Sequence, residues 1–357
     1  MDTFVQIVLV VSFLIHSVLK NLVIGGIPIL LMTHHRGRHG EARTYYESLA
    51  KGMSHAAPMI FGLAAAFGLV LWVSVWLQYG WTLSPVFGSV TLGWMALLAL
   101  LLLGFWGVTR VSRSYPDVSG TQWTLGSLTF FCMIAITGLF VSSHTGMFAF
   151  PRSAGTLVAG QMHDVGGATF WPRFFHSIFS GIAITGMTLT IYGSLRPQCR
   201  EDSQVDPAPY DTRLVRYGVG WVLGGTVPQV VVGPWFLLAL PSDVRFHLVD
   251  GTSVVSLIFF VSLTLTLLSL VLLNSSLMIP QKRGLVWGGV GSLIVTMVFM
   301  VLIREEVRKI WMTVNGEPTF LGDLSWLVVI SVMGIMGVGL YLGGRYVTLS
   351  HSRTMIS

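Results

Sequence analysis

Long apolar segments with almost no charge restrict this chain to a membrane-spanning fold. A helix that crosses a bilayer needs about 20 apolar residues, and the sequence supplies nine such segments separated by polar loops. The predicted spans are residues 4–32, 54–79, 88–110, 123–147, 172–195, 214–240, 250–276, 284–304 and 324–347. We therefore predict an all-α, polytopic integral membrane protein with nine transmembrane helices.

The composition agrees with this class and excludes soluble ones. Of the 357 residues, 53% are hydrophobic and only 10% are charged, whereas a soluble domain has about 25% charged residues. The net charge of +6 lies mostly in short loops, so it indicates topology and not nucleic-acid binding. No loop is large enough for a soluble domain, so residues 1–357 are expected to form a single transmembrane domain.

Basic residues alternate between the two sides of the predicted membrane. The loops after spans one, three, five and seven and the C-terminal segment are rich in Lys and Arg, while the other side carries only Arg152, Arg173, Arg245, Arg304, Arg308 and Lys309. Because cytoplasmic loops carry the excess of positive charge, the N-terminus is predicted outside and the C-terminus in the cytoplasm. The first apolar segment is too long for a cleaved signal, and no basic region precedes it.

The stretch Trp171–Gly181 places His176 inside an apolar segment. At 1.5 Å per residue, His176 lies about 6 Å inside the outer end of the fifth span. A buried imidazole in lipid is costly unless it is paired or ligated. We interpret His176 as a ligand of a heme b; the structural alternative is a core histidine that hydrogen-bonds a neighbouring span.

Other ionisable residues gather in the same outer half. His144 lies near the end of span four, His247 precedes span seven, and Glu305 and Glu306 end span eight. A cofactor near one membrane face would produce this asymmetry, whereas scattered structural residues would not. The alternatives are a helix-end hydrogen bond for His144 and a solvated loop position for His247.

His16 and Lys20 lie deeper, in the first span. They are four residues apart and therefore share one helix face. A lysine at this depth needs an anion or a water-filled cavity, and a heme propionate or a carboxylate from another span would serve. Snorkelling to an interface is the alternative.

Cysteine chemistry offers no other cofactor site. The two cysteines, Cys132 and Cys199, form no Cys-x-x-Cys-His motif for a covalent heme and are too few for an iron–sulfur cluster. A redox cofactor must therefore be held by His, Met or carboxylate, and Met147 is the one methionine considered as an axial ligand. His55 and the cluster His34-His35-x-x-x-His39 are interpreted as helix-end and solvated residues.

In order along the chain, four segments resemble motifs of subunit I of the cytochrome bd-type quinol oxidases. They are Phe13–His16, Leu49–Gly62, Phe174–Gly181 and Arg304–Trp311. The resemblance implies nine spans with the N-terminus outside, a location in the bacterial cytoplasmic (inner) membrane, and hemes toward the outer face. It also implies that His176 ligates a low-spin heme b, that His16 and Glu305 ligate further hemes, and that Arg308 lies near a propionate.

The chain also departs from this family. The third span has no acidic residue, although the family carries proton-delivering glutamates there, and the quinol-binding loop is reduced to about Pro241–Val249. Val249 lies roughly where the methionine ligand of the low-spin heme is expected. His247 or His144 could replace that methionine as the partner of His176.

These observations lead to a functional hypothesis. The chain is predicted to be a membrane electron-transfer subunit with one to three hemes b, which exchanges electrons between the quinone pool and an outer-side partner such as a multiheme cytochrome c. Asp250 and Glu306, or Asp243, would accept quinol protons, since quinol oxidation releases two protons with its electrons. The alternatives are a bd-type quinol:oxygen oxidoreductase with altered proton delivery, and a heme-free transporter or structural membrane subunit.

Overall fold

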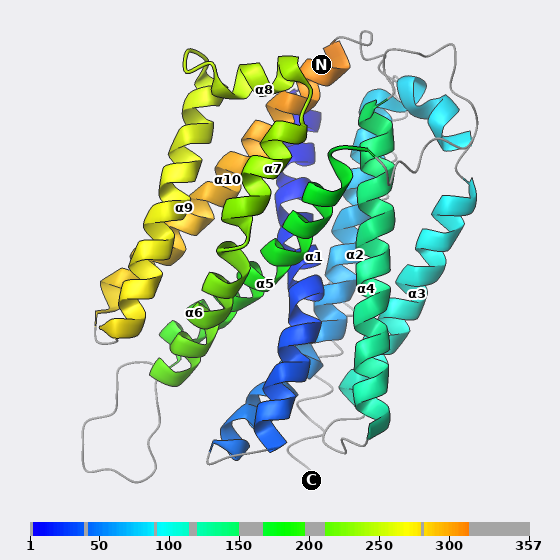
Figure 1. Cartoon of the computed structure of the whole chain (residues 1–357). Coiled ribbons are helices and arrows are strands. Elements are labelled where there is room, and N and C mark those ends of the chain that lie inside the picture. Colours follow the sequence, from blue (N-terminus) through cyan, green and yellow to red (C-terminus); the bar gives the residue numbers. More distant parts are fainter. Residues whose placement is uncertain are drawn as a thin grey trace.

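The computed structural model describes residues 3–38, 42–88, 91–113, 120–149, 167–196, 211–279 and 282–313. Within these ranges all regular structure is α-helical. The helices are α1 (Thr3–Arg38), α2 (Arg43–Gly88), α3 (Thr91–Arg113), α4 (Gly120–Ala149), α5 (Phe170–Leu195), α6 (Thr212–Thr226), α7 (Gln229–Ala239), α8 (Ser242–Val249), α9 (Val254–Met278) and α10 (Arg283–Thr313) (Figure 1).

Eight helical segments in the described part are long and apolar enough to cross a membrane. They match the first eight predicted spans and confirm the all-α, multi-pass membrane class. The ninth predicted span, 324–347, lies outside the described residues. Several helices are longer than predicted: α1 has 36 residues and α2 has 46, so each is longer than the hydrocarbon core of about 30 Å requires at 1.5 Å per residue.

Helix α1 is the centre of the bundle. It packs against α2, α4, α5 and α10, and Figure 1 shows it between α2–α4 on one side and α6–α10 on the other. The first residues of α1, the short helix α8 and the last residues of α10 lie at one end of the bundle (Figure 1), which we call the α8 end. Helix α8 carries His247, one of the predicted ligands.

Glycines let α5 approach its neighbours closely. A Cβ added to Gly25 of α1 would overlap the backbone of Gly181 in α5. On the other side of α5, a Cβ on Gly186 would lie 2.6 Å from the Val222 nitrogen of α6. Small residues at helix crossings are the usual means of tight packing in lipid, where no hydrophobic force draws helices together.

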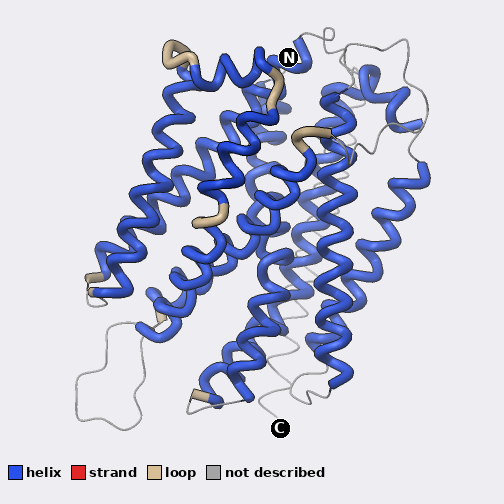
Figure 2. Tube along the Cα trace, in the orientation of Figure 1, coloured by secondary structure: helices blue, strands red, loops and turns tan. Residues whose placement is uncertain are grey.

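The sixth span is interrupted. The hydropathy pattern predicts one continuous helix over 214–240, but α6 ends at Thr226 and α7 begins at Gln229 (Figure 2). Pro228 lacks an amide proton and cannot continue the hydrogen-bond ladder. The Gln229 side chain donates to the Gly225 carbonyl at 3.0 Å, so a side chain satisfies backbone that the break leaves free, as lipid requires.

Serines spaced seven residues apart join α9 to α10. Ser262, Ser269 and Ser276 are all buried on α9. The Ser269 hydroxyl donates to the Gly289 carbonyl of α10 at 2.9 Å. A seven-residue repeat keeps these small side chains on one face along the helix, which lets α10 lie alongside α9.

Candidate functional site

His16 is held by α2. Its Nδ1 lies 2.9 Å from the Ala64 carbonyl oxygen, which can only accept a hydrogen bond, so Nδ1 carries the proton and donates. The neutral imidazole then keeps its lone pair on Nε2. The ring also contacts Phe140 of α4, with 6.3 Å between ring centroids. His16 is therefore a fixed imidazole with one nitrogen available as a ligand.

Lys20 lies one turn further along α1, within the same interior region. Its Nζ lies 5.9 Å from the centroid of the Phe140 ring. Lys20 is close enough to His16 and His176 to act on both electrostatically, and Arg304 acts on Lys20 in turn. Helices α1 and α5 thus bring two of the predicted ligands and the predicted propionate partner together, and α10 adds Arg304 beside them.

Arg304 was missed as a site residue by sequence reasoning. It lies on α10, and its guanidinium carbon is 3.5 Å from the centroid of the Phe13 ring on α1. Sequence patterns identified its neighbours Glu305 and Arg308 because they match the family motif. The sequence does show that Arg304 is a charged residue at the end of an apolar span. It does not show that Arg304 lies beside α1.

His176 combines deep burial with exposed surface. Its side-chain surface is exposed, yet protein atoms surround the residue and desolvate it. Arg173, one turn earlier on α5, is half-buried, with its guanidinium carbon 5.1 Å from the centroid of the Phe236 ring.

The acidic candidates of α10 differ in exposure. Glu305 is buried, with 8% of its surface exposed, and Glu306 is half-buried. Both engage in further contacts. The side chain of Arg308 lies outside the described residues, so its predicted role near a propionate stays a prediction.

The connection between the sixth and seventh spans holds His247 and Asp250. It contains the short helix α8, so His247 is half-buried on a helix and not in an open loop. The Asp250 carboxylate accepts from the Thr252 and Ser253 amides at 3.0 and 3.1 Å. These hydrogen bonds hold the pKa of Asp250 below its usual value, which suits a turn-stabilising residue better than a proton acceptor near neutral pH.

Other predicted residues are placed less completely. His144 lies on α4, but its side chain and those of Met147 and Asp243 fall outside the described residues. Cys132 is buried, and its thiol donates to the Leu100 carbonyl at 3.2 Å. The described residues contain no group of three or more His, Cys, Asp or Glu that could hold a metal ion; a heme iron takes only one or two protein ligands.

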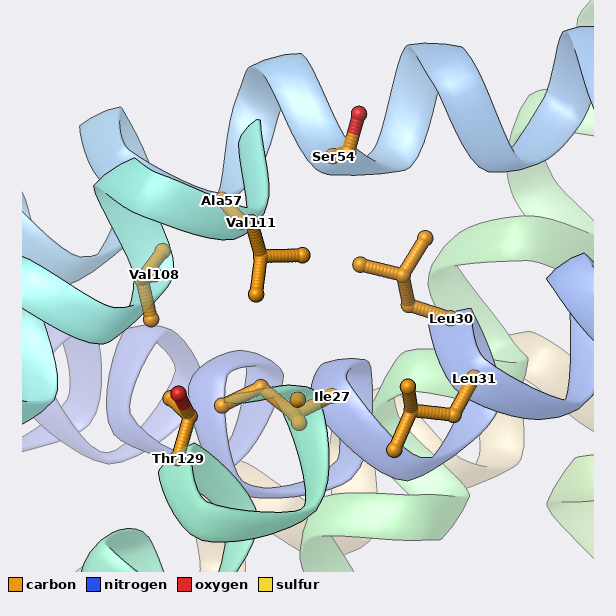
Figure 3. A pocket seen from close by; sticks show the side chains of 9 residues that line it. Ile27, Leu30, Leu31, Ser54, Ala57, Val108, Val111 and Thr129 are labelled. Atoms are coloured by element: carbon orange, nitrogen blue, oxygen red, sulfur yellow. The ribbon is translucent and has the colours of Figure 1, made fainter. Parts of the chain in front are cut away.

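A pocket elsewhere in the bundle has no ionisable lining residue. It lies between α1, α2, α3 and α4 and is lined by Ile27, Leu30, Leu31, Ser54, Ala57, Val108, Val111, Gly126 and Thr129 (Figure 3). The hydroxyls of Ser54 and Thr129 donate within their own helices, to Lys51 and Leu125 carbonyls. The lining residues of this pocket therefore supply no titratable side chain for acid–base chemistry.

Comparison with known proteins gives a likeness in fold alone. No protein-family model and no curated protein matches the sequence. Among solved structures, the bd oxidase from Geobacillus thermodenitrificans superposes with a TM-score of 0.72 at 10% sequence identity, covering 98% of this chain and 98% of the matched chain. The fold resemblance inferred from the four short motifs is thus confirmed: this protein is a multi-pass membrane protein with the fold of a bd oxidase chain.

Proposed function

We propose that this chain is a heme b-bearing membrane subunit that exchanges electrons between the quinone pool and a redox partner on the outer side. The observation that carries the proposal is the convergence of His16, His176 and Lys20 in the interior of a bd-oxidase-like bundle. Histidines on two different helices, close to one buried cation, are what a site for an anionic, iron-bearing cofactor needs.

The residues present fit a heme. His16 offers Nε2 as a ligand because Nδ1 is engaged with the Ala64 carbonyl. His176 keeps solvent-accessible surface, and Glu305 is a buried carboxylate on α10. When bound, a heme b supplies reversible one-electron transfer. His247 or His144 would be the second ligand at His176.

The basic residues fit the propionates of such a group. Within the part of the chain that the structure describes, the charged group that acts on Lys20 is Arg304, which carries the same sign. A buried ammonium without an opposite charge is costly in the membrane interior, so a carboxylate beside Lys20 and Arg304 would lower that cost. Arg308 is proposed to act in the same way.

Quinol protons must leave on the side where the quinol is oxidised. Glu306 is half-buried at the α8 end and is the favoured acceptor. Asp250 is the second candidate, although its carboxylate is engaged in the turn before α9. A multiheme cytochrome c is the proposed electron partner, because the chain has neither the motif for a covalent heme nor the cysteines for a cluster.

The absorption spectrum of the purified protein tests the proposal. Dithionite-reduced bands of heme b are expected, and His176→Ala should remove one low-spin heme while leaving signals from other sites. Lys51→Ala, at an exposed position on α2, is the control. A wild-type spectrum without heme bands would contradict the proposal and favour the transporter or structural alternative.

A second candidate function is a quinol oxidase that reduces oxygen, which the bd-oxidase fold favours. The absence of acidic residues from α3, Thr91–Arg113, argues against it, because oxygen reduction requires proton delivery to a buried site. Oxygen consumption with a quinol donor distinguishes the two. Quinol-dependent oxygen consumption would favour the oxidase.

A further inference from the structure

The imidazole of His16 lies in a seat formed by two residues of α2. Ala64 and Gly68 are four residues apart and therefore occupy one face of that helix. Ala64 provides the carbonyl that accepts from Nδ1 at 2.9 Å. Gly68 provides the space: it has no side chain where the ring lies.

The missing side chain of Gly68 is what allows the ring to lie so close. A Cβ at this position would be 2.9 Å from Cε1, 3.0 Å from Nδ1 and 3.8 Å from Nε2 of His16. The first two distances are below ordinary van der Waals contact, so the ring would have to move. Nε2 is the most distant of the three atoms and stays free of α2.

The Ala64 bond and the Gly68 space act on the same ring in different ways. The carbonyl selects the tautomer with the proton on Nδ1, and the glycine sets how near the ring approaches α2. Metal-bound histidines usually donate their second ring N–H to a carbonyl or carboxylate in this way, which fixes the tautomer and the ring orientation.

We propose that Gly68 is a positioning residue for His16, which together with the Ala64 carbonyl orients the imidazole so that Nε2 faces a heme iron. That the bound group is a heme rests on the proposed function. That Ala64 and Gly68 hold the His16 ring rests on the contacts of the ring itself. Gly68 touches the ligand residue and not the reacting atoms.

A structural role for Gly68 predicts a different outcome from a positioning role. Alanine favours helix more than glycine does, and the group that its methyl would meet is the end of a side chain and not backbone. Gly68→Ala should therefore fold normally while displacing the His16 ring. The matched control is Gly62→Ala on the same helix, where no heavy atom lies within 4 Å of an added Cβ.

The first test is a heme titration of the purified variants, followed by absorption. In Gly68→Ala we expect the heme affinity of the His16 site to fall roughly 10–100-fold, the usual effect of disturbing a residue that supports a metal ligand. The His176 heme should be retained, and Gly62→Ala should match the wild type. Equal affinities and spectra in Gly68→Ala and Gly62→Ala would overturn the proposal.

The second test does not depend on heme. Nitrogen-15 resonances of histidine-labelled protein in lipid nanodiscs report which ring nitrogen carries the proton. We expect the Nδ1–H form of His16 in the wild type and in Gly62→Ala, and an altered tautomer or shift in Gly68→Ala. An Nε2–H form in the wild type would overturn the proposal that Ala64 and Gly68 orient the His16 ring. Absence of heme from the wild type would instead overturn the proposed function.

Discussion

At the scale of the residue, Lys20 shows how strongly lipid constrains a single side chain. Its ammonium lies near an aromatic face and near His16 and His176, and its charged neighbour Arg304 has the same sign. In water such a lysine would be unremarkable, but in a bundle interior it raises the local potential felt by anything bound there.

Lys20→Met should lower the midpoint potentials of the proposed hemes. Removing a positive charge favours the oxidised form, which is the more positive one. For a charge about 10 Å from the iron and an effective dielectric constant of about 20, the change is about 1–2 kcal/mol, which is on the order of 60 mV for one electron. Redox titration of the absorption bands measures it.

Lys20→Arg keeps the positive charge, so the midpoint potentials should stay close to those of the wild type. Lys51→Met removes a charge from the exposed surface of α2 and serves as the control. If Lys20→Met leaves every midpoint potential unchanged, Lys20 does not act on the hemes.

The chemistry of each site residue decided whether the sequence could identify it. His16 and Lys20 were identifiable because ionisable groups in an apolar span need a reason to be there. Ala64 and Gly68 were not, because a backbone carbonyl and an absent side chain leave no signal in one sequence. Arg304 was passed over because its partner, the ring of Phe13, comes from a helix nearly 300 residues away in a chain of 357.

At the scale of the element, the crossing of α5 and α6 depends on paired glycines. A Cβ on Gly218 would lie 2.5 Å from the Thr190 hydroxyl and 2.6 Å from the Thr190 nitrogen. Backbone cannot yield as a flexible side chain can, so an added methyl group must push the two helices apart.

Gly218→Ala should therefore destabilise the protein by about 1–3 kcal/mol, the usual effect of overpacking. Gly220→Ala on the same helix, where an added Cβ meets nothing within 4 Å, should change stability by no more than about 0.5 kcal/mol. Unfolding of the two variants in detergent measures the difference, and equal stabilities would refute the packing role of Gly218.

The break between α6 and α7 shows what hydropathy leaves out. Residues 214–240 are apolar enough for one span, and Pro228 and Pro234 both lie within it. Pro234 is accommodated inside α7, whereas the helix stops before Gln229. Apolar content predicts that a segment crosses the membrane. Where its backbone can be interrupted depends on local hydrogen bonds, here the one from the Gln229 side-chain amide to the Gly225 carbonyl.

At the scale of the whole molecule, the two ends of the bundle differ in charge as the loop sequences predicted. Helices α1 and α3 end in Arg36, Arg38, Arg110 and Arg113, away from the α8 end. The placement of eight helices could be predicted from apolar segments alone, whereas their mutual packing could not, since it depends on individual glycines and serines. The orientation in the membrane stays a prediction.

Single cysteines at the two ends of α9 test that orientation. In a Cys132→Ser and Cys199→Ser background, Thr252→Cys should react with a membrane-impermeant maleimide in intact cells, and Lys282→Cys should react only after lysis. Both positions are exposed, so accessibility and not burial decides the result. The reverse labelling pattern would place the N-terminus in the cytoplasm.

The central place of α1 also has a consequence for biosynthesis. This helix is synthesised before the other described helices, yet its contacts with α10 become possible only after about 300 further residues have been made. Until then, His16 and Lys20 lack the surroundings that make them tolerable in lipid. Chains that stop before α10 should therefore be exposed to membrane proteases, which would remove subunits in which the proposed cofactor site is incomplete.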